Sequence, residues 1–261
     1  MTGEAPSERG KFEREWRRRF ENFARDATAQ HEISGWSEPG LRRRVRGFEE
    51  LLASEGLASA RSVLDLGTGA GTYVRLLADR GHRTVGVDYS IESLHRARSA
   101  DPGGAGQYVG AAAYELPFAD GEFDLVVMIG IFQALSEPDR AIDEVRRILR
   151  PGGHLILEIL NYDEIFIRAR ALFKHAREKG EGVRFYRRGP MKRRLRSHGF
   201  RPVADVPIYL PPRKYPVFER VLEHPLSRSV LHSVPGLSLL GAAAFLMLCR
   251  REAALPQGTQ E

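Results

Sequence analysis

The chain has 261 residues, of which 42% are hydrophobic and 28% are charged, and its formal net charge is +6. These values are ordinary for a globular protein, and they predict one large α/β domain with a substantial core, alone or with appendages. The single cysteine, Cys249, excludes a disulfide framework and a zinc site built from several cysteines.

The N-terminal region is expected to form a short tail followed by helices. Residues 1–10 lack the apolar stretch of a secretory signal, so we expect a disordered tail and a cytoplasmic location. A helix is predicted over 11–29, where four aromatic residues recur on one face: Phe12, Trp16, Phe20 and Phe23. A loop at 31–40 and a second helix at 41–55 complete an expected helical lid over 11–55.

Strands and helices then alternate, which is typical of a parallel sheet covered by helices on both faces. The predicted strands are 62–66, 84–88, 107–109, 123–128 and 154–159, and the predicted helices are 71–80, 91–99 and 138–149. The sequence PGG at 151–153 ends a helix and leads into the last of these strands.

The alternation stops after Asn161. A basic helical insertion is predicted over 160–190, then a helix ending near Gly199, a strand at 201–209, a rigid LPPRKYP segment and a helix at 217–224. The apolar run 237–249 is shorter than the ~20 residues of a spanning helix, so it predicts a buried closing strand over 243–250. The main domain is therefore expected over 56–251, with a tail at 252–261.

The positive charge is concentrated in residues 165–201, which hold thirteen Lys or Arg against two Glu, so the rest of the chain is net −5. This segment has three interpretations. It forms a solvated helix surface, it attracts an anionic small molecule or an anionic membrane surface, or it binds RNA phosphates. The few aromatic residues in the segment and the absence of a recognisable RNA-binding module argue against RNA.

A glycine-rich turn follows the first predicted strand of the main domain. Gly67, Gly69 and Gly71 form G-x-G-x-G, whereas the dinucleotide fingerprint G-x-G-x-x-G requires a glycine where Thr72 stands. Asp65 precedes the turn and would repel a pyrophosphate. A zwitterion that carries both an ammonium and a carboxylate suits these residues better.

With these residues, the sequence resembles the class I S-adenosylmethionine-dependent methyltransferases. Asp65 and the three glycines match the first motif of that family, and Asp88 in GVDYS, the segment LPFADGEFDLVV at 116–127 and the segment EVRRILRPGGHLIL at 144–157 extend the match. The resemblance implies a Rossmann-like, doubly wound, mostly parallel sheet of seven strands, with S-adenosylmethionine as cofactor. The cofactor-binding residues that it implies are Asp65, Gly67, Thr68, Gly69, Gly71, Asp88, Tyr89, Ala112, Ala113 and Met128, with Asp88 holding the ribose hydroxyls.

Two positions depart from the family pattern. Ala112 stands where the family often has an acid that accepts from the adenine amino group, so cofactor binding should be weakened by about 1 kcal/mol. Ala134 stands where a histidine is common, which leaves Gln133 as the polar side chain there. Other candidates for an acid–base role follow predicted strand ends or lie in the N-terminal loop: Glu158, Tyr162, Asp163 and His31.

The sequence therefore predicts methyl transfer to an oxygen, nitrogen or carbon nucleophile of a small molecule, catalysed mainly by positioning. The acceptor is expected to be anionic or lipid-like, and the protein to touch a membrane peripherally at most. Two alternatives stay open: an RNA methyltransferase, and a non-catalytic binding or regulatory protein that kept the fold.

Overall fold

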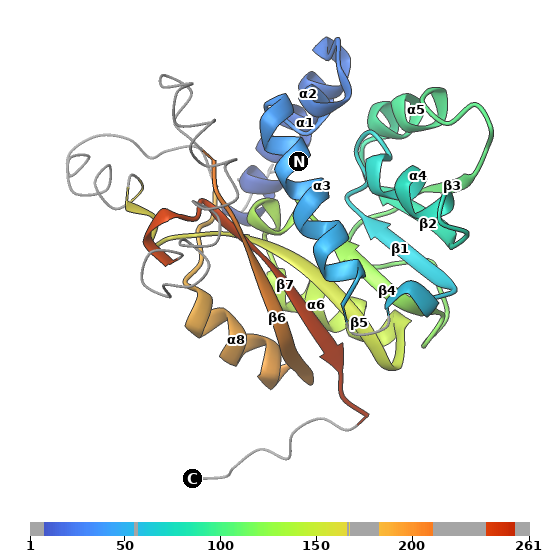
Figure 1. Cartoon of the computed structure of the whole chain (residues 1–261). Helices are drawn as coiled ribbons and strands as arrows, with labels where there is room; N and C mark the ends of the chain where they lie inside the picture. The colour runs from blue at the N-terminus through green and yellow to red at the C-terminus, as the bar shows by residue number, and fades with distance from the viewer. Residues whose placement is uncertain (1–7, 55–56, 166, 168–182, 211–238, 254–261) are drawn as a thin grey trace, which may run out of the picture.

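A computed structural model describes residues 8–54, 57–165, 167, 183–210 and 239–253. A seven-stranded sheet forms its centre, in the order β3-β2-β1-β4-β5-β7-β6 (Figure 1). Strands β1 to β5 all run parallel to one another, whereas β7 runs antiparallel to its neighbours β5 and β6. The predicted Rossmann-like fold is confirmed.

The strands are β1 (Ser62–Leu66), β2 (Arg83–Asp88), β3 (Gly106–Gly110), β4 (Phe123–Met128), β5 (Leu149–Leu160), β6 (Phe200–Ile208) and β7 (Ala244–Arg251). The helices are α1 (Glu8–Asp26), α2 (Gln30–Ile33), α3 (Glu38–Leu52), α4 (Thr72–Ala78), α5 (Ile91–Ser99), α6 (Pro138–Ile148) and α8 (Arg188–Ser197), with short 3-10 turns at Leu57–Ser59 and Phe132–Ala134.

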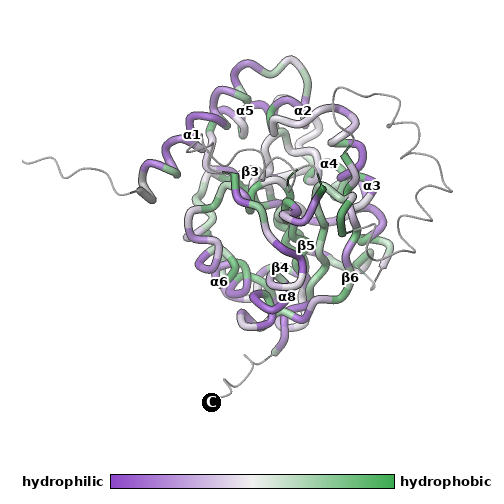
Figure 2. The backbone as a smooth tube through the Cα atoms, turned by 90° about the vertical axis from the view of Figure 1, so that its left-hand side faces the viewer, coloured by the Kyte–Doolittle hydropathy of each residue, from purple (hydrophilic) through white to green (hydrophobic). Residues whose placement is uncertain are grey.

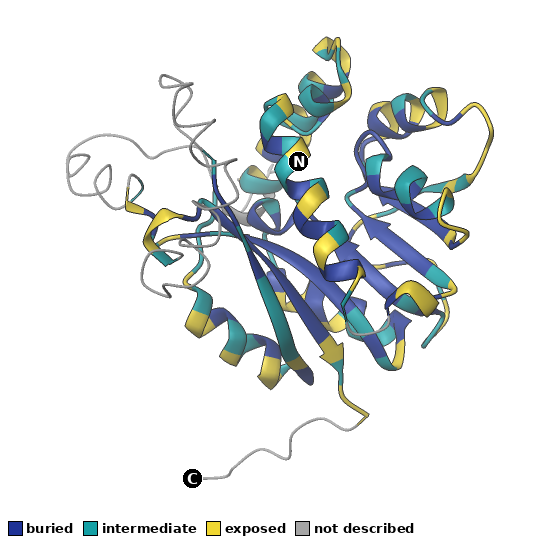
Figure 3. Ribbon diagram, in the orientation of Figure 1, coloured by how far each residue is buried: buried dark blue, intermediate teal, exposed yellow. Residues whose placement is uncertain are grey.

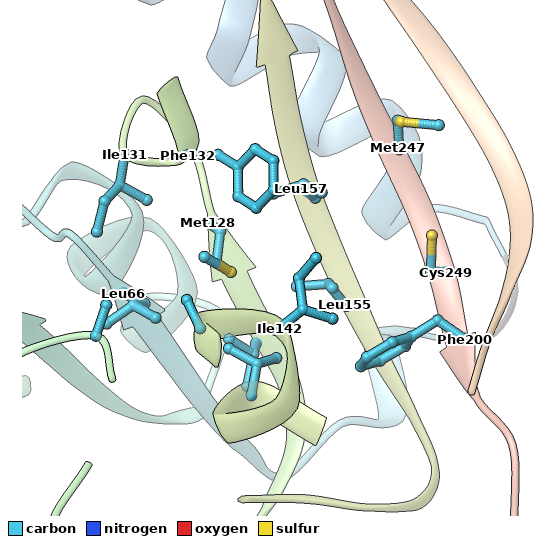
Figure 4. Close-up of a cluster of buried hydrophobic side chains, with 14 of the residues drawn as sticks. Leu66, Met128, Ile131, Phe132, Ile142, Leu155, Leu157, Phe200, Met247 and Cys249 are labelled. Carbon is cyan, nitrogen blue, oxygen red and sulfur yellow. The ribbon is translucent and has the colours of Figure 1, made fainter. Parts of the chain in front are cut away.

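Alternate residues of the central strands are buried on opposite faces of the sheet, because successive side chains of a strand point in opposite directions. Leu64 of β1 packs in a cluster with α6 and α8, whereas its neighbour Val63 packs in a second cluster with α3 and α4. In Figure 3 the central strands are mostly buried, whereas the edge strands β3 and β6 are largely intermediate. In Figure 2 the hydrophobic residues gather at the centre, while α1 is mostly hydrophilic. Figure 4 shows part of the first cluster, in which Ile142 of α6 faces Leu155 of β5.

Several predicted boundaries were wrong at the N-terminal side. Helix α1 begins at Glu8, so the predicted tail over 1–10 is too long by three residues. Helix α3 begins at Glu38 inside the predicted loop, because the Ser37 hydroxyl accepts a hydrogen bond from the Gly40 N–H and a proline occupies the first helical turn. The loop also contains the single turn of α2.

The C-terminal predictions have mixed outcomes. The closing strand predicted from the apolar run is confirmed as β7. The end of the predicted helical insertion is not helical, since Tyr186 pairs with Asn161 in an isolated bridge beside β5. Glu252 in the predicted tail is held by a hydrogen bond from its N–H to the Gly199 carbonyl. The predicted helix at 217–224 and most of the insertion lie outside the described residues.

A buried ion pair fixes α3 on the sheet. The Arg44 Nε donates to Glu158 Oε1 over 2.8 Å, and the two side chains are 4% and 0% exposed. The Arg44 guanidinium also lies 4.3 Å from the centre of the Trp36 ring and donates to the Gly40 carbonyl. Two desolvated charges of this kind hold each other, and either one alone would be strongly unfavourable.

Replacing Arg44 by Met should therefore lower the free energy of unfolding by about 3–5 kcal/mol, because Glu158 would stay buried without its partner. The double variant Arg44→Met/Glu158→Leu should recover most of this loss. The control is Arg42→Met, which removes an exposed ion pair with Glu38 on the same helix. This variant should change the free energy of unfolding only slightly. Chemical denaturation measures all three, and equal effects of Arg44→Met and Arg42→Met would contradict the assignment.

Candidate functional site

The glycine turn between β1 and α4 adopts a backbone that only glycine takes easily. Gly67, Gly69 and Gly71 have φ angles of 78°, 51° and 71°. A Cβ atom on Gly67 would lie 2.9 Å from the Cβ of Ile131, so the turn also packs too closely for a side chain. The N–H groups of Gly67 and Thr68 both donate to the Val87 carbonyl, over 2.7 and 3.0 Å, which ties the turn to the end of β2.

Asp65 supports this turn from behind. Its side chain is 2% exposed, and its Oδ2 accepts a hydrogen bond from the Thr68 hydroxyl over 2.8 Å. Burial raises the pKa of Asp65 from 3.8 to about 7, and the Thr68 hydroxyl and the neighbouring Asp88 act in opposite directions on this shift. Neither Asp65 nor Thr68 nor Gly71 belongs to the wall of the adjoining cleft.

Asp88 lies at the carboxyl end of β2 and does face the cleft. Its Oδ2 accepts from the Gly69 N–H over 3.0 Å, and its Oδ1 accepts from the Ser90 N–H over 2.9 Å. Burial raises the pKa of this carboxyl, while the backbone hydrogen bonds oppose the shift. Because each carboxylate oxygen has two acceptor sites, both can accept one further hydrogen bond from a ligand.

The cleft opens at the carboxyl ends of β1, β2 and β4, where open α/β sheets bind their ligands. Its empty space, including the part that is open to solvent, is about 1010 Å³. Its lining comes from the strand ends and from the first two helices: Glu13, Trp16, Arg17, Phe20, Ile33, Ser34, Leu66, Gly67, Gly69, Val87, Asp88, Tyr89, Ser93, Ala111, Ala112, Ala113, Tyr114, Ile129, Gly130, Ile131, Ala134 and Leu135.

Helix α1 covers one side of this cleft with aromatic rings. The Trp16 and Phe20 rings are stacked with centres 5.2 Å apart, and Phe20 meets the Tyr89 ring edge-on at 6.4 Å. Arg17 lies 5.2 Å above the same Tyr89 ring. The aromatic stripe of the first helix thus packs on the domain and lines the cleft at the same time.

The structure brings together six of the predicted cofactor residues in the cleft wall: Gly67, Gly69, Asp88, Tyr89, Ala112 and Ala113. Met128 is a correction, because it is fully buried and points into the core on the α6 side, whereas the next two residues, Ile129 and Gly130, reach the cleft (Figure 4). The strand alternation that buries Met128 also explains the error.

The predicted acid–base candidates do not line the cleft. Glu158 is the buried partner of Arg44 and lies outside the cleft wall. Tyr162 is 41% exposed and lies under the Arg187 guanidinium at 4.9 Å, while Asp163 pairs with the same arginine. His31 in α2 is also absent from the cleft wall.

Gln133 has a supporting position instead. Its Nε2 donates to the Gly130 carbonyl over 2.6 Å, which holds the loop after β4 in place.

A polar group at the rim was missed by sequence reasoning. The Ser136 hydroxyl donates to Glu13 Oε1, and the Tyr114 hydroxyl lies 3.0 Å from Ser136 Oγ and accepts from the Ser136 N–H over 2.8 Å. The helical spacing could have indicated that Glu13 faces the cleft, because Glu13 and Arg17 share a helix face with Trp16 and Phe20. The partner Ser136 is 123 residues away in sequence and gave no signal.

Comparison with known proteins agrees with this site. Residues 64–157 match the model of a family described as "Methyltransferase domain". This segment therefore carries a methyltransferase domain. The matched region contains the glycine turn, Asp88 and the segments 111–114 and 129–135, all of which contribute to the cleft wall.

Three relatives illustrate the similarity of this methyltransferase domain. An uncharacterized methyltransferase of Mycobacterium sp. (strain JLS) is 36% identical over 110 residues, or 42% of each chain, so the match spans under half the length of that relative. A Thermotoga maritima structure described as an S-adenosylmethionine-dependent methyltransferase has a TM-score of 0.56 at 20% identity, covering 92% of this chain and 98% of the other. The [4+2]-cyclase SpnF has a TM-score of 0.57 at 20% identity, covering 81% of each chain.

S-adenosylmethionine is the cofactor of this domain class, and the cleft fits it. Asp88 offers free acceptor sites suited to a ribose diol. Gly69 has no side chain, so the space between the turn and the Ser34 hydroxyl stays open; an added Cβ would lie 3.2 Å from that hydroxyl. The apolar part of the wall, with Leu135 and the alanines at 111–113, suits a purine ring. Glu115 does not replace the acid missing at Ala112, because it is exposed and outside the cleft wall.

Among the described residues, no group of three or more His, Cys, Asp or Glu is placed to hold a metal ion. In the same part of the chain, no helix is both long and apolar enough to cross a membrane.

The raised pKa of Asp65 predicts a pH-dependent stability. The unfolded chain releases this proton near pH 3.8 and the folded chain near pH 7, so the contribution of Asp65 is present at low pH and is lost as the pH rises through about 7. Between pH 5 and 8, wild-type stability should therefore fall relative to Asp65→Asn, as measured by chemical denaturation. The control Asp79→Asn, an exposed carboxylate at the end of α4, should show a constant difference. A constant difference for Asp65→Asn as well would contradict the prediction.

Proposed function

We propose that the protein transfers a methyl group from S-adenosylmethionine to a small-molecule acceptor. The observation that carries the proposal is the single continuous cleft in which the backbone of the glycine turn, the Asp88 carboxylate and the apolar wall face the same space. Within it, the cofactor-binding residues are Gly67, Gly69, Asp88, Tyr89, Ala112 and Ala113, with Asp65, Thr68 and Gly71 supporting the turn from behind.

The chain's own residues supply binding, orientation and exclusion of water. The Asp88 carboxylate accepts the ribose hydroxyls while its bonds to Gly69 and Ser90 keep it in place. When bound, the cofactor supplies a methyl group on a sulfonium, which is already activated toward a nucleophile. The aromatic face of α1 with Trp16 and Phe20 covers the cleft and keeps water from this space.

Catalysis in this proposal rests on positioning, which contributes several kcal/mol without an obligatory acid or base. The predicted bases lie outside the cleft, and Gln133 acts on the loop rather than on the acceptor. The cleft is lined largely by aromatic and aliphatic side chains, so its shape suits a small, partly apolar acceptor better than a nucleic-acid chain.

The cofactor assignment is tested by calorimetric titration of the full chain with S-adenosylhomocysteine. Wild-type protein should bind with micromolar affinity, and Asp88→Asn should weaken binding at least about tenfold, because the amide loses one acceptor and adds a donor. The control is Asp101→Asn, since Asp101 likewise accepts two backbone N–H groups but lies outside the cleft wall. A wild-type protein that fails to bind at millimolar ligand would leave only a non-catalytic protein of this fold.

The missing acid at position 112 gives a second prediction. Ala112→Asp should tighten S-adenosylhomocysteine binding about fivefold, because a new acceptor for the adenine amino group contributes about 1 kcal/mol. Ala112→Leu, which adds bulk without an acceptor, is the control and should not tighten binding. If both variants bind no better than wild type, the adenine ring lies elsewhere in the cleft.

Once cofactor binding is established, methyl acceptors are screened with a methyl-labelled cofactor.

A further inference from the structure

A second hollow lies beside the cleft, at the start of α6. Eight residues line it, and we call it the arginine hollow: Ser136, Glu137, Pro138, Asp139, Arg140, Arg184, Tyr186 and Arg194. They come from three parts of the chain, namely the loop into α6, the extended segment beside β5 and the helix α8. Figure 1 shows α8 next to β6, on the same side of the sheet as α6.

The three arginines of the hollow differ in how far they are neutralised. Arg194 Nε donates to Asp139 Oδ1 over 2.5 Å, and His198 Nε2 lies 2.9 Å from the same oxygen. Arg140 is 3.4 Å from Glu137 and 53% exposed, so this pair is loose. Arg184 has no carboxylate partner in the part of the chain that the structure describes.

Arg184 is held in place by neutral groups. Its Nη1 donates to the Ser136 carbonyl over 3.0 Å, and its guanidinium lies 4.8 Å from the centre of the Phe12 ring. Its backbone N–H donates to the Gln133 carbonyl over 3.3 Å. A guanidinium has five N–H donors, so most of them remain for another acceptor. A cation that is oriented but not neutralised is typical of an anion-binding position.

Tyr186 adds a neutral donor to the same wall. Its hydroxyl is buried and has no hydrogen-bond partner among the described residues. Burial raises the pKa of this phenol, and the neighbouring Arg184 and Arg194 side chains oppose the shift. The hydroxyl therefore keeps its proton and can donate it to an anion. A buried hydroxyl without a partner is unfavourable, and a bound oxyanion would remove this cost.

The hollow is continuous in sequence with the wall of the cleft. Ala134 and Leu135 line the cleft, and the next residue, Ser136, lines the hollow. Glu13 and Tyr114, which line the cleft, both contact Ser136. The cleft and the arginine hollow therefore adjoin each other at Ser136.

We propose that the arginine hollow binds a phosphate-type oxyanion group of the methyl acceptor, with Arg184 and Tyr186 as the direct donors. The proposal rests on the proposed function and narrows it to acceptors that carry such a group. It also separates Arg184 from Arg188 and Lys192 of the basic segment, which both pair with the buried carboxylate of Asp205.

The test is calorimetric titration of the full chain with inorganic phosphate at constant ionic strength. Wild-type protein should bind phosphate, Arg184→Gln should weaken binding at least about tenfold, and Tyr186→Phe should weaken it about threefold. The matched control is Arg193→Gln, which removes the same charge from the exposed face of α8 outside the hollow and should change binding less than about twofold.

Binding of S-adenosylhomocysteine to the same variants separates the two proposals. It should be unchanged in Arg184→Gln and Tyr186→Phe, which also shows that both variants fold. Normal binding of the cofactor product without phosphate binding by wild type would overturn the arginine hollow and leave the methyltransferase proposal standing. Equal weakening of phosphate binding by Arg184→Gln and Arg193→Gln would also overturn it, because the effect would then come from general surface charge.

Two further ligands identify the source of the oxyanion. Phosphatidylcholine vesicles with added phosphatidic acid should bind no better to wild type than to Arg184→Gln if the group belongs to a soluble acceptor, and a selective loss in the variant would support a lipid acceptor. A short single-stranded RNA that binds more tightly than phosphate, and weakens equally in Arg184→Gln and Arg193→Gln, would overturn the small-molecule site in favour of backbone phosphates.

Discussion

The site depends on the joining of two neighbouring strand ends. The turn after β1 is bound to the end of β2 by two N–H groups that share the Val87 carbonyl and by the Gly69 N–H that donates to Asp88. The positive φ angles of the glycines allow these bonds. A side chain at Gly67 would in addition collide with Ile131. The carboxylate and the bare backbone therefore face one space as a consequence of a single local constraint.

The N-terminal helices complete the site from outside the sheet. The Arg44–Glu158 pair fixes α3, and Trp36, just before that helix, packs on Gly130 so closely that an added Cβ there would lie 2.3 Å from the ring. Gly130 belongs to the cleft wall. The buried ion pair, which has no direct contact with the cleft, therefore holds the helix that follows Trp36.

The fold alone does not decide the reaction, since a protein described as a [4+2]-cyclase shares this architecture. What favours methyl transfer here is the combination of the family match over 64–157 with an intact turn and Asp88. The arginine hollow beside the cleft then distinguishes one end of the acceptor from the other. Arg184 is held by neutral groups, so its positive charge can act on a ligand. The ion-paired arginines of α8 instead interact with carboxylates of the protein itself.

The sequence by itself determined the order of strands and helices, the glycine turn, Asp88 and the closing strand, because periodicity and turn residues act over short distances. It also identified the basic segment as a local feature. Only the tertiary structure decided that Glu158 is the buried partner of Arg44, 114 residues away, rather than a candidate base. It likewise placed Ser136 against Glu13 and left Arg184 without a carboxylate among the described residues. Such pairings depend on how distant segments pack, and neither composition nor spacing records them.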